Sequence, residues 1–207
     1  SILIPNKDHT DDLDVCLNSF FERADYQNYE FIIIENNSVL PETFAYYEKI
    51  EKEHDNVKVV YWEAGFNYSA INNFGFKFAK GDYIMLLNND VELITPDIFQ
   101  SMLGFCMRPE VGIVGAKLLY NDHTVQHAGV LVGAGGLADH VFKGIHEDDP
   151  GYIGRAISSQ DVSAVTAACL LVKRSVYEEV GGLEDEFQVA FNDVDFCLKV
   201  RKAGYLI

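Results

Sequence analysis

Short runs of consecutive apolar residues alternate with longer stretches of mixed polarity through the first half of the chain. The apolar runs are too short for helices, and they lie at residues 2–4, 31–34, 57–62, 83–87 and 111–114. Between the first two runs, apolar residues return at helical spacing at Leu13, Leu17 and Phe20. Continuous apolar strands separated by helices indicate an α/β fold, in which a mostly parallel central sheet carries helices on both faces.

Capping residues mark where several helices begin and end. Residues 41–54 form an expected helix opened by its proline, and Asn67 can cap a helix that ends near Ala79, with Gly81 as the C-cap. Thr95-Pro96-Asp97 combines a capping hydroxyl, a proline at the first helical position and an acid in the first turn. We therefore predict a helix that begins at this tripeptide.

The second half of the chain is less regular. Glycine is frequent across residues 120–160, which predicts hairpins and a long loop. A strand is expected at residues 164–172, followed by a helix from Arg174 and a final helix from about Asp193 to Ala203. No linker rich in proline or serine and no repeat divides the sequence, so we predict that residues 1–207 form a single domain.

Polar residues follow three of the predicted strands. They are Asn6 to Asp8, Glu35 to Ser38 and Asn88 to Glu92. Ligands of open α/β sheets bind beyond the carboxyl ends of the strands. These side chains are therefore expected to gather along one edge of the sheet, where a ligand would bind.

The charge balance narrows the class of partner. Asp and Glu number 32 against 16 Lys and Arg, which gives a net charge of −16. Such a surface repels phosphate backbones, so it argues against nucleic-acid binding, and it does not suit a basic interfacial membrane helix. Clustered acids do suit a site in which a divalent cation reverses the local charge.

Cysteine usage and the chain ends bear on the cellular context. The four cysteines are far apart and show no CxxC spacing, so we expect neither a zinc site nor a disulfide framework. We expect the protein to reside in a reducing compartment. No signal peptide and no run long enough to span a bilayer is visible. The chain begins and ends inside apolar runs, which suggests a domain of a longer polypeptide.

Asp90 is the candidate metal ligand. It follows the strand at 83–87 through Asn88 and Asn89. Hard divalent cations bind carboxylate oxygens and leave coordination positions for substrate phosphates, and a cation beside a diphosphate stabilises it as a leaving group. The alternative is an ordinary turn, because Asn and Asp are common where strands end.

Asp193 is the candidate general base. It lies with Asn192 and Asp195 at the start of the final helix. An aspartate at a helix N-terminus favours the ionised form and can accept the proton of a hydroxyl that attacks a bound substrate. The alternative is capping, with Asn192 as the N-cap and both aspartates stabilised in the first turn.

Weaker candidates lie elsewhere in the chain. Glu35 and the residues after it could bind a nucleobase or a ribose, or could form only a turn. Asn73-Phe74-Gly75 could bring a helix close to a nucleotide, or could pack that helix tightly on the sheet. His127 and His140 could line a second substrate site, although a single histidine is more often structural. Gly181-Gly182 is expected to be a turn.

Taken together, these motifs resemble the inverting glycosyltransferases of family 2, which have the Rossmann-like GT-A fold, and in particular the bacterial rhamnosyltransferase-like branch. The matching segments cover nearly the whole chain in the family's order. They are residues 1–5 with Lys7-Asp8, 34–38, 73–75, 79–82, 86–90, 168–172, 181–183 and 192–195.

The resemblance implies a role for each matching residue. Asp90 would bind the metal, Asp193 would be the base, and Glu35 would contact the nucleobase. The donor would be bound by Pro5, Lys7, Asp8, Glu35, Asn37, Asn73, Asn88 and Asn89, and the acceptor side would include His127, His140 and Asp195. The sequence departs from the family at Asn192, where glutamate is usual, at Asn88 and Asn89, where aspartates are common, and at Asn72, where an arginine is frequent.

The resemblance also implies an activity. The enzyme would use Mg²⁺ or Mn²⁺ and transfer a hexose or deoxyhexose from a dTDP-, UDP- or GDP-sugar to a glycan or a lipid-linked acceptor in cell-surface polysaccharide synthesis. Residues 1–119 would form the donor half and 120–207 the acceptor half. A cytoplasmic location at the inner membrane face is implied, and so is a metal-binding histidine downstream of residue 207.

Two other classes of function remain open at this point. A sugar nucleotidyltransferase would also combine a sugar nucleotide, a metal and an α/β sheet, but it usually has a glycine-rich basic loop, and Asn6 to His9 contain no glycine. A non-catalytic module that binds a sugar nucleotide or a glycan is the second. A Rossmann dehydrogenase is disfavoured, because no GxGxxG follows the first strand.

Overall fold

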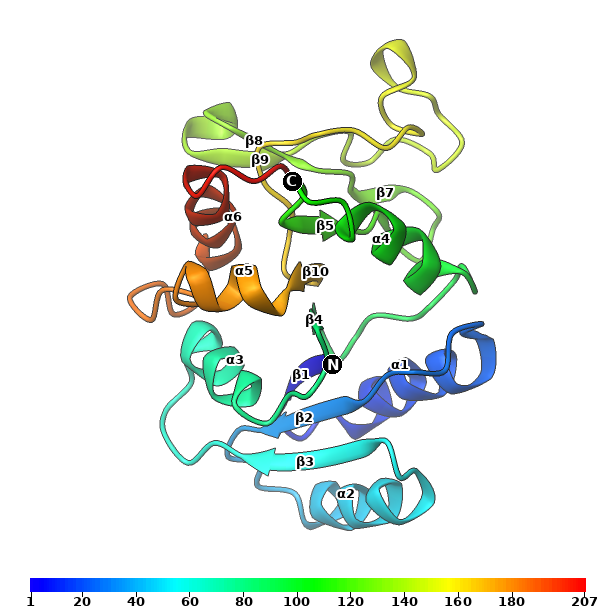
Figure 1. The fold of residues 1–207 in the computed structure, drawn as a ribbon. Coiled ribbons are helices and arrows are strands. Elements are labelled where there is room, and N and C mark those ends of the chain that lie inside the picture. Colours follow the sequence, from blue (N-terminus) through cyan, green and yellow to red (C-terminus); the bar gives the residue numbers. More distant parts are fainter.

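The computed structural model describes all residues from 1 to 207, and a six-stranded mixed sheet forms its centre (Figure 1). The strand order is β3-β2-β1-β4-β10-β5. The strands are β1 (Ile2–Asn6), β2 (Phe31–Glu35), β3 (Val57–Tyr61), β4 (Tyr83–Leu87), β5 (Ile113–Gly115) and β10 (Cys169–Lys173). The predicted α/β fold is confirmed.

The sheet is parallel on one side and antiparallel on the other. β1 pairs in parallel with β2 and β4, and β2 pairs in parallel with β3. β10 is antiparallel to both of its neighbours, β4 and β5. A strand from the second half of the sequence therefore lies between two strands from the first half, and the two halves share one sheet.

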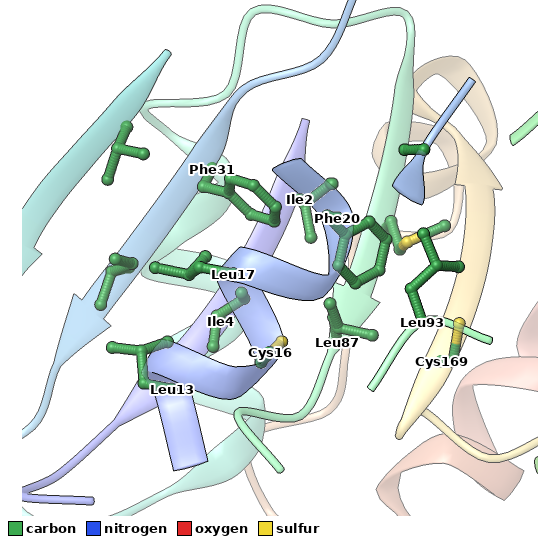
Figure 2. Packing of buried hydrophobic residues seen from close by; sticks show 14 of the residues in the cluster. Ile2, Ile4, Leu13, Cys16, Leu17, Phe20, Phe31, Leu87, Leu93 and Cys169 are labelled. Atoms are coloured by element: carbon green, nitrogen blue, oxygen red, sulfur yellow. The ribbon is translucent and has the colours of Figure 1, made fainter. Parts of the chain in front are cut away.

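Helices cover both faces of the sheet, as expected. α1 (Thr10–Arg23), α2 (Pro41–Glu53) and α4 (Ile98–Cys106) contribute to one apolar core, and α3 (Tyr68–Phe76), α5 (Arg174–Glu179) and α6 (Asn192–Lys202) contribute to the other. Figure 2 shows the first core, in which Leu13, Leu17 and Phe20 of α1 pack against Ile2, Ile4 and Phe31. The helical spacing of apolar residues in 10–23 thus reflects this buried face.

The expected irregular region contains two small hairpins. One pairs β6 (Leu118–Leu119) with β7 (Val125–His127), and the other pairs β8 (Val130–Val132) with β9 (Ala138–His140). Two short 3₁₀ turns, η1 (Ala134–Gly136) and η2 (Tyr152–Gly154), lie in the same region. No helix of the structure combines the length and the apolar character needed to cross a bilayer.

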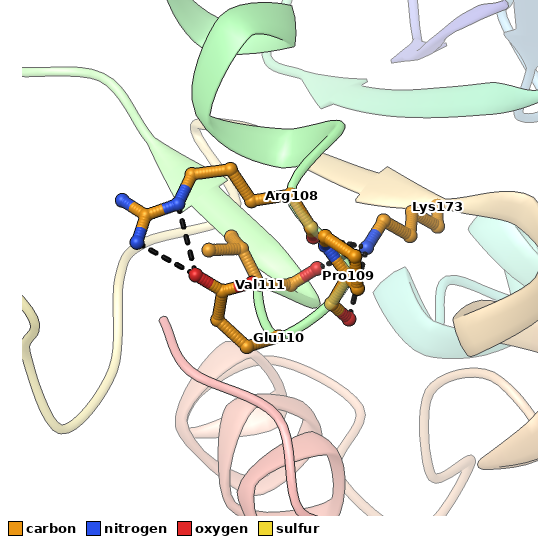
Figure 3. Close-up of polar contacts among 5 residues, drawn as sticks. All are labelled: Arg108, Pro109, Glu110, Val111 and Lys173. Atoms are coloured by element: carbon orange, nitrogen blue, oxygen red, sulfur yellow. Dashed lines mark hydrogen bonds and ion pairs between the residues drawn. The ribbon is translucent and has the colours of Figure 1, made fainter.

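Lys173 joins the end of α4 to the antiparallel part of the sheet (Figure 3). Its ammonium group donates to the backbone carbonyls of Arg108 at 2.7 Å and Val111 at 2.6 Å, and more weakly to that of Pro109 at 3.4 Å. Carbonyls that follow a helix lack partners within the helix, so a lysine that binds them stabilises the chain reversal. This contact holds β5 beside β10.

Two predicted helix boundaries are wrong. α4 begins at Ile98 with Asp97 as its N-cap, and the carbonyl of Pro96 accepts a hydrogen bond from Asp25 N–H at 3.0 Å in place of one from a helix amide. α3 is capped by Asn67 as predicted but ends at Phe76, after which tight turns lead to Gly81. Gly81 is therefore not a C-cap.

Other boundaries differ by a few residues. Residues 164–168, predicted to be part of a strand, lie outside β10, with Ala164 in an isolated bridge and Ala167-Ala168 in a turn, and β5 begins two residues later than expected. Asn192 is the first helical residue of α6, and the N-cap is Phe191 in the left-handed region with φ 62°. The predicted helices at 41–54 and from Arg174, and the turn at Gly181-Gly182, are confirmed.

Gly75 allows α3 to pack closely on the sheet. A Cβ at this position would lie 2.6 Å from Cδ1 and 2.7 Å from Cγ1 of Ile34, which is fully buried in β2. Close helix packing, one of the two interpretations of the Asn73-Phe74-Gly75 motif, is therefore confirmed.

We predict opposite effects for the same substitution in two helices. Gly104→Ala in α4, where a Cβ would meet nothing within 4 Å, should raise the free energy of unfolding by about 0.5–1 kcal/mol through helix propensity. Gly75→Ala should lower it by about 1–3 kcal/mol, because overpacking outweighs the same gain. Urea denaturation measures both, and a stabilised Gly75→Ala variant would contradict the packing argument.

Candidate active site

The carboxyl edge of the parallel strands collects the polar residues, as predicted. Asn6 at the end of β1 and Glu35 at the end of β2 are register partners, and Asn88 directly follows β4. Because β10 is antiparallel, it starts at this same edge, with Cys169 opposite Leu87. The segment that precedes β10 is thus delivered to the ends of β1, β2 and β4.

A chain of buried hydrogen bonds runs across this edge. Asn89 Nδ2 donates to Asn6 Oδ1 at 2.7 Å, Asn6 Nδ2 donates to the Tyr47 hydroxyl at 2.7 Å, and that hydroxyl donates to Glu35 Oε2 at 2.8 Å. Asn6, Tyr47 and Glu35 are each 3% exposed or less. Burial raises the pKa of Tyr47, which keeps its hydroxyl protonated as the donor.

The same chain continues into the loop after β2. Both the hydroxyl and the backbone N–H of Ser38 donate to the Glu35 carboxylate, and Ser38 Oγ accepts from Asp8 N–H at 2.8 Å. The Asp8 carboxylate accepts from the N–H groups of Leu40 and Val39, and the Leu40 bond is the main reason that the pKa of Asp8 is lowered. These contacts fix the two loops against each other.

Three further residues that were predicted to bind the sugar-nucleotide donor lie beside these loops. Asn37 is exposed, with φ 58°, and its Nδ2 donates to the Ala64 carbonyl at 2.7 Å. Asp8 has φ 61°, so two non-glycine residues of this edge adopt the left-handed region, where strain is often stored at functional sites. Lys7 is exposed and Pro5 is half-buried. Their contacts with a donor remain predictions.

Asp90 is the free carboxylate of the loop after β4. It is exposed, whereas the nearby Glu92 is paired with Arg23 at 2.9 Å. No group of three or more His, Cys, Asp and Glu side chains is arranged to hold a metal ion. A single carboxylate still fits Mg²⁺ or Mn²⁺, because such ions often bind one protein carboxylate together with substrate phosphates and water.

Segment 166–168, the three residues Thr166, Ala167 and Ala168 before β10, connects the two principal candidates. Its Ala167 N–H donates to Asp193 Oδ2 at 3.3 Å, and its Ala168 carbonyl accepts from Asn88 N–H at 3.0 Å. The hydroxyl of Tyr68, at the start of α3, donates to the Ala167 carbonyl at 3.2 Å. The structure therefore brings Asp193 and the loop 88–90 to one short piece of backbone.

The start of α6 holds Asp193 in a defined position. Its Oδ1 accepts from Val194 N–H at 2.8 Å, as a carboxylate in a first helical turn commonly does. The preceding Asn192 is buried, and its side-chain oxygen accepts from Asp193 N–H at 2.8 Å. Burial raises the pKa of Asp195, which Lys199 opposes, and Asp195 Oδ2 is buried without a partner.

Asn73 belongs to a different network. Its Nδ2 donates to the Leu183 carbonyl and to Asp185 Oδ1, and its Oδ1 accepts from the Tyr177 hydroxyl and from Leu183 N–H. These four bonds use the full hydrogen-bonding capacity of an amide side chain. The structure thus gives Asn73 a role in holding the turn that leads to α6, and its contact with a donor remains a prediction.

His127 and His140 face each other across the hairpin region. Their Nδ1 atoms are 2.8 Å apart, and His127 is 1% exposed while His140 is half-buried. Any contribution of His127 to an acceptor site is therefore indirect.

Sequence reasoning missed three participants at this edge. Tyr47 links β1 to β2, Tyr68 and Asp193 both bind the backbone of Ala167, and segment 166–168 joins the candidates. Both tyrosines lie within ordinary amphipathic helices, and their contacts are distant in sequence. No local signal marks them, because their function depends on where the chain folds back.

The arrangement of a mostly parallel sheet with polar loops at its carboxyl edge is that of the GT-A glycosyltransferases. The mannosyltransferase PcManGT of Pyrobaculum calidifontis, in complex with GDP-Man and Mn²⁺, aligns with a TM-score of 0.71 at 14% identity over 99% of this chain and 52% of that chain. TarS of S. aureus aligns with a TM-score of 0.64 at 14% identity, covering 96% of this chain and 32% of that one.

The chain belongs to glycosyl transferase family 2, whose family model matches residues 1–181. It is 45% identical over 209 residues to "Uncharacterized protein y4gI" of Sinorhizobium fredii, covering 99% of this chain and 23% of the relative. It is 38% identical over 205 residues to the O-antigen biosynthesis protein RfbC of Myxococcus xanthus, covering 99% of this chain and 16% of RfbC. The chain thus spans less than a quarter of the length of these curated relatives.

We expect Tyr47→Phe to destabilise the protein more than Tyr46→Phe in the same helix. Loss of the Tyr47 hydroxyl leaves Asn6 and Glu35 buried without one partner each, which should lower the free energy of unfolding by about 2 kcal/mol. The Tyr46 hydroxyl binds only the half-buried Asp14, so its loss should cost about 0.5–1 kcal/mol. Equal urea midpoints for the two variants would show that the buried chain adds no stability.

Proposed function

We propose that this chain is the catalytic domain of an inverting glycosyltransferase. It transfers a sugar from a nucleoside diphosphate sugar to a hydroxyl of a glycan or a lipid-linked acceptor during the synthesis of a cell-surface polysaccharide. The observation that carries the proposal is the attachment of both Asp193 and the loop 88–90 to segment 166–168 at the carboxyl edge of the sheet. Family membership and the relative in O-antigen biosynthesis support it.

Asp193 is the proposed base. It accepts the proton of the acceptor hydroxyl while that oxygen attacks the anomeric carbon from the face opposite the diphosphate. The bond between the anomeric carbon and the diphosphate oxygen breaks, and the configuration at that carbon inverts. The contacts of Asp193 with Ala167 and Val194 support this role, because they hold the carboxylate in one orientation.

Asp90 is the proposed ligand of Mg²⁺ or Mn²⁺. A divalent cation bound there neutralises the charge that develops on the diphosphate leaving group. The exposure of Asp90 supports this role, and so does the pairing of Glu92 with Arg23, which leaves Asp90 as the carboxylate that can turn to a ligand. The Mn²⁺ complex of the structurally similar mannosyltransferase is consistent with it.

The donor half is proposed to comprise residues 1–119 and the acceptor half residues 120–207. In the donor half, Pro5, Lys7, Asp8, Glu35, Asn37, Asn73, Asn88 and Asn89 would bind a dTDP-, UDP- or GDP-sugar directly or by holding the loops that do. In the acceptor half, His140 and Asp195 would lie beside the acceptor. GDP-Man and UDP-GlcNAc are the donors bound in structurally similar enzymes.

The nucleotidyltransferase alternative is disfavoured by the family of the chain. A module that binds sugar nucleotides without turnover predicts the same fold and the same donor affinity. Such a module and a glycosyltransferase differ only in the product assay, in which the module would release no nucleoside diphosphate.

Asp193→Asn is expected to abolish transfer while it leaves donor binding intact. Loss of a general base should lower kcat by about 10²–10⁴-fold, and the donor Kd should change little because Asp193 faces the acceptor. The measurement is release of nucleoside diphosphate, with calorimetry for the donor. Asp55→Asn is the matched control, since it removes the same charge from an exposed turn before β3, away from the carboxyl edge of the sheet, and should retain most of the kcat. Turnover of Asp193→Asn near wild type would rule out this base.

Removal of the metal should weaken nucleotide binding by the wild type and not by the Asp90→Ala variant. We expect UDP, dTDP or GDP to bind the wild type at least about ten-fold more tightly with Mn²⁺ than with EDTA, and this difference to vanish in Asp90→Ala. Glu92→Ala is the control, because Glu92 is already paired with Arg23. If the variant kept the full Mn²⁺ effect in calorimetry, Asp90 would not be the ligand.

A further inference from the structure

His127 and His140 form a hydrogen-bonded pair in the hairpin region of the second half of the chain. His127 ends β7 and His140 ends β9, and their rings meet edge-on, with 5.0 Å between centroids and an interplanar angle of 83°. The short contact between the two Nδ1 atoms requires a proton on one nitrogen and a lone pair on the other. The pair can therefore form only while one ring donates and the other accepts.

The other nitrogen of His127 decides which ring donates. Its Nε2 accepts from the backbone N–H of Gly129 at 3.3 Å and from that of Thr166 at 3.4 Å. Nε2 must then be unprotonated, so a neutral His127 carries its proton on Nδ1 and donates it to His140. Burial, and secondarily His140, lower the pKa of His127 to about 3, which favours this neutral form.

Thr166, the residue held by His127, begins segment 166–168. Before it, Ala164 forms a bridge with Val130, and after it Cys169 enters β10 opposite Leu87. Between these two anchors, His127 binds the N–H of Thr166, and the next residues bind Asp193 and Asn88. A shift of Thr166 would therefore move the groups that face both candidates.

We propose that His127 is a positioning residue of the transfer reaction, which it serves by holding segment 166–168 so that Asp193 stays aligned with the donor loop 88–90. This inference rests on the proposed function, in which Asp193 is the base. His127 acts through its Nε2 lone pair and the N–H of Thr166, and it touches neither substrate. His140 accepts the Nδ1 proton of His127 and so stabilises the tautomer that leaves Nε2 free to accept.

Two amide substitutions separate the two nitrogens of His127. The amide of His127→Gln reaches the position of Nε2 and can still accept from Thr166. The shorter amide of His127→Asn ends near the position of Nδ1 and can retain only the contact with His140. In the full-length protein with Mn²⁺, we would measure release of nucleoside diphosphate from UDP-GlcNAc, GDP-mannose and dTDP-rhamnose, with water and octyl glycosides as acceptors.

The two variants should differ in kcat and not in donor KM. His127→Asn should lower kcat by about ten- to a hundred-fold, because a small misplacement of a catalytic group has an effect of this size. His127→Gln should restore most of that loss, and donor KM should stay within about three-fold for both. Equal kcat values for the two variants, whether both high or both low, would overturn the proposal.

Two measurements do not depend on turnover, and the first of them uses only the wild type. In the wild type, ¹⁵N chemical shifts should show His127 as the neutral tautomer protonated on Nδ1, and a proton on Nε2 would overturn the proposal. If the wild type transferred no sugar at all, the proposed function would fail, and amide hydrogen exchange would then decide the inference. Exchange at Thr166 and Ala167 about ten-fold faster in His127→Asn than in His127→Gln would support it, and equal rates would reject it.

Discussion

The antiparallel insertion of β10 between β4 and β5 is the constraint on which the site depends. A parallel strand in that position would begin at the opposite edge of the sheet, and its preceding residues would lie far from the ends of β1, β2 and β4. Because β10 runs the other way, segment 166–168 arrives beside Asn88, and α6 follows closely enough for Asp193 to bind it. Strand direction thus brings the second half of the chain to the edge that the first half builds.

The loops at this edge are organised by buried polar contacts more than by apolar packing. Glu35 accepts hydrogen bonds from Tyr47 and Ser38, and Asn6 connects Tyr47 to Asn89. Buried polar groups are costly unless they are paired, so such a chain is stable only when all members are in place. It gives this edge a preformed shape, and under the proposed function a bound nucleotide would need to order few residues there.

Individual residues show which features of the fold could be predicted from the sequence. The apolar runs predicted the five strands that the first half contributes to the central sheet, and the order of polar residues after them predicted the edge at which the candidates gather. Helix signals were less reliable. Thr95 and Pro96 carry every local mark of a helix start, yet α4 begins at Ile98, and the Pro96 carbonyl accepts a hydrogen bond from Asp25 N–H. Asn192 has the residue type of an N-cap, but Phe191 takes that place. In both cases a local preference worth about 1 kcal/mol is overridden by the surrounding chain.

By itself, the sequence determined the class of fold, the family resemblance and the residue types available for chemistry at Asp90 and Asp193. Periodicity and residue chemistry are local properties, and they can be read from neighbouring positions. Only the tertiary structure decided that Tyr47 bridges β1 and β2, that Asn73 is committed to the turn before α6, and that His127 meets Thr166 across 39 positions. These contacts arise from the order and direction of strands, and that order is set by the packing of the whole sheet.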